Sequence, residues 1–109
     1  MFLVQFSFEV PEDKIQEFIK YSSRVLKKTW EAYSCRSYTA YRSATKRIRS
    51  DQVIKENEII EQLVFDSSDD LERMFDMSNL KTEDLEAAKS YDERFRVRNL
   101  QCGVLEMLQ

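Results

Sequence analysis

The sequence predicts an α+β fold in which one antiparallel sheet carries its helices on a single face. Three observations lead to this prediction. A stretch with period two opens the chain, a long helical stretch follows it directly, and an apolar strand-like stretch lies near the end. Two more strand-like stretches and a second helical region lie between them. The resulting order, βαββαβ, is typical of helices packed as one layer against a sheet.

The first strand is predicted from Phe2 to Val10, where large apolar residues occupy alternate positions. Period two marks a strand with one strongly apolar face. A helix is expected to begin at Pro11, because proline is tolerated in a first turn and acidic residues follow it. A stripe recurs at three- and four-residue intervals in this helix: Ile15, Phe18, Ile19, Ser22, Val25 or Leu26, and Trp30. This stripe is expected to cover the first strand.

Two strands are predicted in the middle of the chain. Residues 34–42 are rich in Tyr and Thr but less apolar, which indicates a half-exposed or edge strand. Residues 58–65 carry apolar side chains on both parities, which indicates an interior strand covered on both sides. The polar segment between them, residues 43–57, contains Lys46, Arg47 and Arg49. It is long for a hairpin connection, and such loops tend to be functional or mobile.

The second helical region is predicted to be broken. Ser67 or Ser68 caps a short helix that extends to Phe75, with acidic residues in its first turn. Asn79 is expected to interrupt it, and Thr82 to begin a second segment that extends to Phe95. The last strand, residues 97–108, is apolar on both faces.

Length and charge limit the organisation and the partners of the chain. Its 109 residues are predicted to form one domain, 1–109. No apolar stretch approaches the ~20 residues needed to cross a bilayer, and Met1 leads straight into a strand, so we expect a cytoplasmic protein without a membrane partner. The net charge of -3 disfavours a nucleic-acid partner. The RNA-recognition modules that share the βαββαβ order also need stacking aromatics that the third strand lacks.

The amino-acid composition argues against several kinds of functional site. The chain has no histidine, the usual neutral-pH acid and base and a common zinc or haem ligand. Gly103 is its one glycine, which excludes glycine-rich phosphate loops. Cys35 and Cys102 are expected on opposite edges of the sheet, too far apart for a disulfide. We therefore expect free thiols, with Cys102 buried and inert, and neither a metal nor a cofactor.

The predicted architecture leaves one face of the sheet bare. Helices that connect strands of one antiparallel sheet return over the same side. The apolar residues expected on the other side are Leu3, Ile60, Val64, Leu105 and Met107. Contiguous exposed apolar patches usually mark interaction sites. The simplest occupant is a second copy related by a twofold axis, so we predict a homodimer.

Three local features, together with the order of elements, resemble a known family. They are the strand end Tyr41-Arg42-Ser43, the strand exit at residues 63–67, and the helix start Asp69-Asp70-Leu71. The chain is similar in these to the dimeric α/β-barrel superfamily, which includes the antibiotic-biosynthesis-monooxygenase-like proteins. The resemblance implies a ferredoxin-like subunit whose sheet faces that of its partner. It also implies a range of activities, among them cofactor-independent oxygenases and isomerases, so it narrows architecture more than function.

A pocket between the facing sheets would be lined by strand residues of the parity opposite to the helices. The candidates are Gln5, Arg36, Tyr38, Arg42, Gln62 and Gln101. Tyr38 could stack on an aromatic ligand, and Arg36 or Arg42 could stabilise an enolate or carboxylate. The alternative is that the tyrosines pack at the interface and the arginines lie on an exposed edge. Glu61, in the most apolar strand, could act as a base through a raised pKa, although pairing with an arginine is commoner.

Two function classes follow. The first is a homodimeric module that binds a small apolar or aromatic molecule between the facing sheets without catalysing a reaction. The second is a cofactor-independent oxygenase or isomerase acting on an activated aromatic or polyketide-like substrate, whose own reactivity would replace the missing catalytic groups. A cavity lined by Tyr38 or by an inward arginine would favour the second class.

Overall fold

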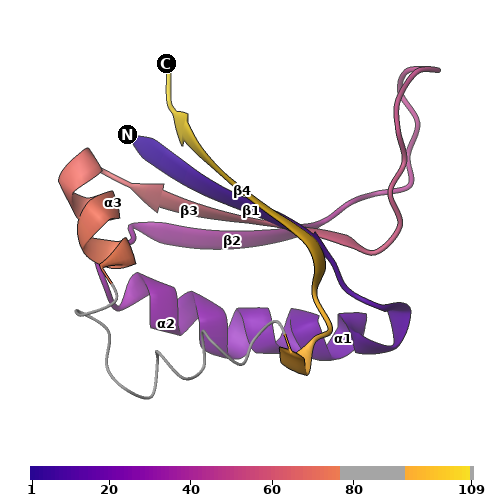
Figure 1. The fold of residues 1–109 in the computed structure, drawn as a ribbon, viewed down its shortest axis with the longest axis horizontal. Coiled ribbons are helices and arrows are strands. Elements are labelled where there is room, and N and C mark those ends of the chain that lie inside the picture. The colour runs from indigo at the N-terminus through magenta and orange to yellow at the C-terminus, as the bar shows by residue number, and fades with distance from the viewer. Residues whose placement is uncertain (77–92, 109) are drawn as a thin grey trace.

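The computed structural model describes residues 1–76 and 93–108 and shows four strands in one antiparallel sheet (Figure 1). Its elements in chain order are β1 (Phe2–Glu9), α1 (Glu12–Tyr21), η1 (Ser22–Leu26), α2 (Lys27–Glu31), β2 (Ser37–Arg42), β3 (Glu58–Phe65), α3 (Ser68–Phe75) and β4 (Arg98–Glu106). The strands lie in the order β2-β3-β1-β4. The predicted α+β, ferredoxin-like class is confirmed.

The helices cover one face of the sheet, as predicted. In Figure 1, α1, η1 and α2 run as one rod along the lower face of the sheet, and α3 packs at one end. The strand order puts β2 and β4 at opposite edges, which separates the two cysteines, and both are free thiols. In the part of the chain that the structure describes, no helix is long and apolar enough to cross a membrane.

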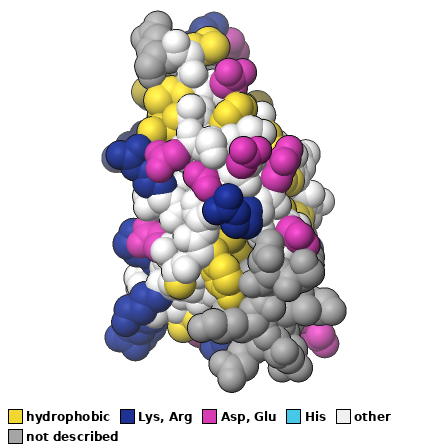
Figure 2. Space-filling view, turned by 90° about the vertical axis from the view of Figure 1, so that its left-hand side faces the viewer, with side chains coloured by type: hydrophobic (Ala, Val, Ile, Leu, Met, Phe, Trp, Pro, Cys, Tyr) yellow, Lys and Arg dark blue, Asp and Glu magenta, His cyan; other side chains and the backbone are white. Residues whose placement is uncertain are grey.

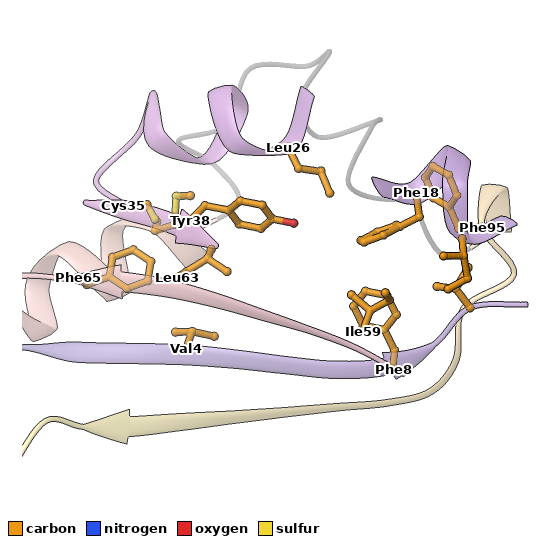
Figure 3. Close-up of a cluster of buried hydrophobic side chains, with 13 residues drawn as sticks. Val4, Phe8, Phe18, Leu26, Cys35, Tyr38, Ile59, Leu63, Phe65 and Phe95 are labelled. Atoms are coloured by element: carbon orange, nitrogen blue, oxygen red, sulfur yellow. The ribbon is translucent and has the colours of Figure 1, made fainter. Parts of the chain in front are cut away.

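The core lies between β1, β3 and the helical rod (Figure 3). Val4 pairs with Leu63 and Phe8 with Ile59, so these four side chains share the face toward the helices, and all are buried. The Phe18 ring meets the Phe8 ring edge-on, with ring centroids 5.6 Å apart. Burial of each such side chain contributes roughly 1.5–3 kcal/mol, so this layer is a principal source of stability.

The first helical stretch departs from a regular α-helix in its middle. The helix begins after Pro11, with Glu12 and Asp13 in its first turn, as predicted. Ser22 to Leu26 then form a π-helical segment, which the sequence pattern did not predict. Of the predicted stripe, Ile19 and Val25 are about two-fifths exposed, at 42% and 39%. The buried members of the stripe are Ile15, Phe18, Ser22 and Leu26.

Two strand predictions need correction. The second strand begins at Ser37, so the buried Cys35 precedes it. Cys102 is exposed rather than buried, as are all nine residues of β4. The reason is that β4, at the edge of the sheet, packs mainly against β1 in the described part of the chain, so its apolar side chains, such as Val104 at 58% and Leu105 at 51%, stay open to solvent.

The loop between β2 and β3 matches its prediction. Residues 43–57 form neither helix nor strand, and the amide of Ser43 donates to the carbonyl of Glu58 across the base of the loop at 3.0 Å. In Figure 1 the loop rises from the sheet on the side away from the helices.

Ser67 caps α3, since its hydroxyl accepts from the amide of Asp70. The predicted break at Asn79 and the segment beginning at Thr82 lie outside the described residues, whereas Phe95 is buried in the core.

Candidate functional site

A buried chain of three polar groups lies between the sheet and the helical rod. The Tyr38 hydroxyl donates a hydrogen bond to the Glu61 carboxylate, and the Ser22 and Tyr38 hydroxyls lie 3.0 Å apart. Ser22 and Glu61 are each 6% exposed and Tyr38 is 2% exposed. Polar groups that are buried this deeply are stable only when they are hydrogen-bonded, which this chain achieves.

The hydrogen bonds among Ser22, Tyr38 and Glu61 all run in one direction. Because Tyr38 gives its single proton to Glu61, its oxygen can only accept from Ser22. Burial raises the pKa of Tyr38, and the adjacent carboxylate of Glu61 raises it further, so the phenol stays protonated at neutral pH. The Ser22 hydroxyl therefore donates its hydrogen bond to Tyr38, and its oxygen can still accept a hydrogen bond from another group.

Each member of the chain is positioned by its own element. Tyr38 lies opposite Leu63 on β3, and Glu61 is the diagonal neighbour two residues away, within reach of a long side chain. Ser22 opens the π-helical segment η1. Such segments often occur at functional sites, because they shift the side chains that follow.

Side chains of α2 hold the backbone of Tyr38 at the open edge of β2. The amide of Tyr38 donates to Glu31 Oε2 at 2.9 Å, and Lys27 Nζ donates to the carbonyl of Tyr38 at 3.3 Å and to Glu31 at 2.8 Å. The hydrogen bond from Lys27, followed by that from the Tyr38 amide, lowers the pKa of Glu31. Together they anchor the edge strand to the helical rod.

A cleft of about 340 Å³ opens beside this chain, between the helical rod and β2. Its apolar wall includes Phe18, Ile19, Ala40 and Ile59. Its polar lining includes Ser22, Ser23, Lys27, Tyr38, Thr39 and Arg42. In Figure 3 the Tyr38 hydroxyl points along the sheet, between Leu26 and the cluster of Phe18 and Ile59. The cleft is thus mainly apolar, with hydroxyl groups at its base.

The structure corrects the predicted position of two site residues. Tyr38 and Arg42 lie on the face toward the helices, because Tyr38 pairs with Leu63 and Arg42 with Ile59, both of which are buried there. The sequence reading assigned them to the opposite face, since β2 carries too few apolar residues to reveal its parity. Both nevertheless line the cleft. Arg42 also contacts Glu12 at 3.4 Å.

The other predicted site residues lie apart from the cleft. Gln5 and Gln62 face each other on the open side of the sheet and are hydrogen-bonded at 3.1 Å. Gln101, opposite Ser7 on the edge strand β4, is exposed. Arg36 forms an exposed ion pair with Asp66 at 2.9 Å. The predicted set therefore divides between two faces.

Of the two polar partners of Tyr38, Glu61 was among the predicted site residues and Ser22 was not. Glu61 is buried, as its apolar strand suggested, and one of its partners is the hydroxyl of Tyr38. Ser22 was assigned to the helical stripe without a role. A hydroxyl in an otherwise apolar stripe was the available signal, because it needs a polar partner once buried.

Comparison with solved structures identifies the fold. A candidate antibiotic biosynthesis monooxygenase from Deinococcus radiodurans superposes with a TM-score of 0.70 at 8% identity, covering 100% of this chain and 94% of the other. A protein from Agrobacterium tumefaciens gives 0.70 at 13% identity, with 100% and 95% covered. HapK from Hahella chejuensis gives 0.67 at 10% identity, with 99% and 93% covered.

The chain has the ferredoxin-like α+β fold of these structures. The resemblance drawn from the sequence is thereby confirmed at the level of architecture. No protein-family model and no curated protein sequence matches the chain. At such low identity a shared fold does not transfer an activity, so function has to be argued from the cleft.

Proposed function

We propose that the protein is a homodimeric module that binds a small, mainly aromatic molecule bearing a hydroxyl group. The ligand lies in the cleft beside Tyr38, on the helix side of each subunit rather than between the facing sheets. The observation that carries the proposal is the directed hydroxyl chain at the base of an apolar cleft.

The size and lining of the cleft define the ligand class. Its volume of about 340 Å³ is at the lower end of the range for small-molecule sites, which favours a ligand of one to three fused rings. Phe18 and Ile59 offer apolar and aromatic surface. Ser22 offers an acceptor, so a phenolic or enolic O–H would add one hydrogen bond.

The homodimer would cover the open face of the sheet. Leu105 and Met107, from the end of the chain, are 51% and 52% exposed, and Tyr41 is 51% exposed. Leu3 pairs with both Val64 and Leu105, which extends an apolar strip across three strands. A second copy, with the same strip, is the complementary partner.

A matched series of probes tests the ligand class. Isothermal titration with 1-naphthol should show binding at least ten-fold tighter than naphthalene, because the hydroxyl satisfies Ser22 and about 1.4 kcal/mol corresponds to ten-fold. Ser22→Ala should remove this preference while leaving naphthalene binding unchanged. Equal affinity for both probes, or no binding of either, would contradict the proposal.

A second candidate function follows from the same chain. A cofactor-independent oxygenase must remove a proton from its substrate, and the chain leads from the cleft to a carboxylate. A substrate proton would pass to Ser22, the Ser22 proton to Tyr38, and the Tyr38 proton to Glu61. Molecular oxygen would then oxidise the activated CH₂ group to a carbonyl, with the second oxygen atom leaving as water.

Oxygen consumption distinguishes the two functions. Anthrone carries such a CH₂ group, and a true oxygenase should consume one O₂ for each anthraquinone formed. Glu61→Gln should then lower the rate at least a hundred-fold, because the proton relay from Ser22 through Tyr38 would lack its terminal base. A wild-type rate equal to the rate in buffer, alongside tight 1-naphthol binding, would leave the binding module as the function.

A further inference from the structure

The loop of residues 43–57, here termed the arm, has an ordered base. The amide of Ser43 donates to the carbonyl of Glu58, and its hydroxyl donates to the Glu58 carboxylate at 2.7 Å. Lys55 pairs with the same carboxylate at 3.4 Å. The two ends of the arm are therefore held together where they leave β2 and β3.

The tip of the arm is shaped by its own side chains. Arg47 donates to the carbonyls of Ser50 at 3.2 Å and Gln52 at 2.8 Å. Gln52 accepts from the amide of Ile48 at 2.9 Å and donates to the carbonyl of Lys46 at 2.7 Å. These hydrogen bonds join the two limbs of the arm near its tip.

Two apolar side chains of the arm are left in solvent. Ile48 is 90% exposed and Val53 is 77% exposed, although the arm around them is hydrogen-bonded. Both side chains are therefore available for contact with another molecule.

The arm points to the side where a second copy would lie. In Figure 1 it rises from one end of the sheet, away from the helices and on the open-face side. Each limb of about seven residues can span roughly 23 Å, whereas packed sheets are about 10 Å apart. The tip would thus pass beyond the plane of a partner's sheet.

Charge indicates where the arm would land. The arm holds four basic residues, Lys46, Arg47, Arg49 and Lys55, against the acidic Asp51 and Glu56. Residues 66–76, at the opposite end of the sheet, hold five acidic residues and one arginine. Figure 2 shows acidic side chains at that end, with basic side chains among them. A twofold axis that runs across the strands would bring the arm of each copy to the acidic end of the other.

We propose that the arm is an intersubunit clasp, in which Ile48 and Val53 pack on a second copy of this chain and Lys46 faces the acidic α3 of that copy. The proposal rests on the homodimer in the proposed function. It adds the contact that closes the dimer at both ends, because an isologous interface repeats every contact twice.

Sedimentation equilibrium tests the apolar part of the clasp. The wild type should be dimeric at micromolar concentration, and Ile48→Ser/Val53→Ser should raise the dimer dissociation constant at least ten-fold. Val25→Ser replaces a partly exposed apolar residue on the helical rod, outside the arm, and should leave the constant unchanged. A wild-type monomer, or an arm variant that dimerises like the wild type, would overturn the clasp.

A charge exchange tests its position. Lys46→Glu and Glu72→Lys should each weaken the dimer several-fold, and the two changes together should restore it. Failure of the double variant to recover would overturn the assignment to α3. Titration with 1-naphthol separates this result from the ligand proposal, because a monomeric arm variant should still bind the probe in its own cleft. If the wild type does not bind 1-naphthol, the ligand proposal is contradicted and the clasp proposal is unaffected.

Discussion

The hydroxyl of Tyr38 donates to the carboxylate of Glu61 across two neighbouring strands, inside a core that is otherwise apolar. The two residues are diagonal neighbours, so β2 and β3 must keep their register for the bond to form. Ser22 extends the bond toward the helical rod. Two members of this buried polar chain, Ser22 and Tyr38, therefore also line the cleft.

Removing the Tyr38 hydroxyl should destabilise the fold. Tyr38→Phe leaves the buried carboxylate of Glu61 without this donor, and we expect a loss of about 1–3 kcal/mol in the free energy of unfolding. Urea denaturation measures it. Tyr41→Phe is the matched control, because Tyr41 is half exposed and should change stability by less than about 0.5 kcal/mol. Equal effects of the two changes would show that the hydroxyl chain is unimportant for stability.

Removing both partners should cost less than the sum of the single changes. Glu61→Leu leaves the Tyr38 hydroxyl without its acceptor, whereas Tyr38→Phe/Glu61→Leu removes the donor and the acceptor of this hydrogen bond together. We expect a coupling energy of about 0.5–3 kcal/mol in a double-mutant cycle, measured by the same denaturation. Additive losses would mean that the two side chains act independently.

The stability that Glu31 contributes by joining α2 to the edge of β2 should be lost at acid pH. The pKa of Glu31 is lowered from 4.5 in the folded chain, so its contribution is present above pH 4.5 and is lost as pH falls through the lowered value. Glu31→Gln should cost under about 1 kcal/mol at pH 7. The difference from wild type should shrink in urea denaturation below pH 4.5. A difference that is constant from pH 7 to pH 3 would contradict this.

The two thiols should differ in reactivity. Burial raises the pKa of Cys35 to about 11, while Cys102 is exposed on the edge strand. At pH 8 we expect Ellman's reagent to label one thiol rapidly and the other only when the chain unfolds, because the thiolate is the reactive form. Cys102→Ser should abolish the rapid phase. Rapid labelling of both thiols would show that the Cys35 site opens readily.

Several elements could be predicted from sequence because their signals are local. Strand β1 shows clean alternation, Pro11 and the acidic residues after it mark the start of α1, and Ser67 caps α3. Strand β2 was harder, since Tyr, Thr and Ser dominate it and no apolar alternation reveals its buried face. Tyr38 was therefore assigned to the wrong face, and the structure places it in the lining of the cleft.

The sequence by itself determined the order of the elements, the helix-covered sheet and the absence of histidine chemistry. These depend on composition and on periodicity within single elements. Only the tertiary structure decided that Ser22, Tyr38 and Glu61 meet, because they come from three elements and their contact depends on strand register and on the π-helical segment. It also decided the direction of the arm, since the direction in which a loop leaves the sheet depends on the strands that anchor its two ends.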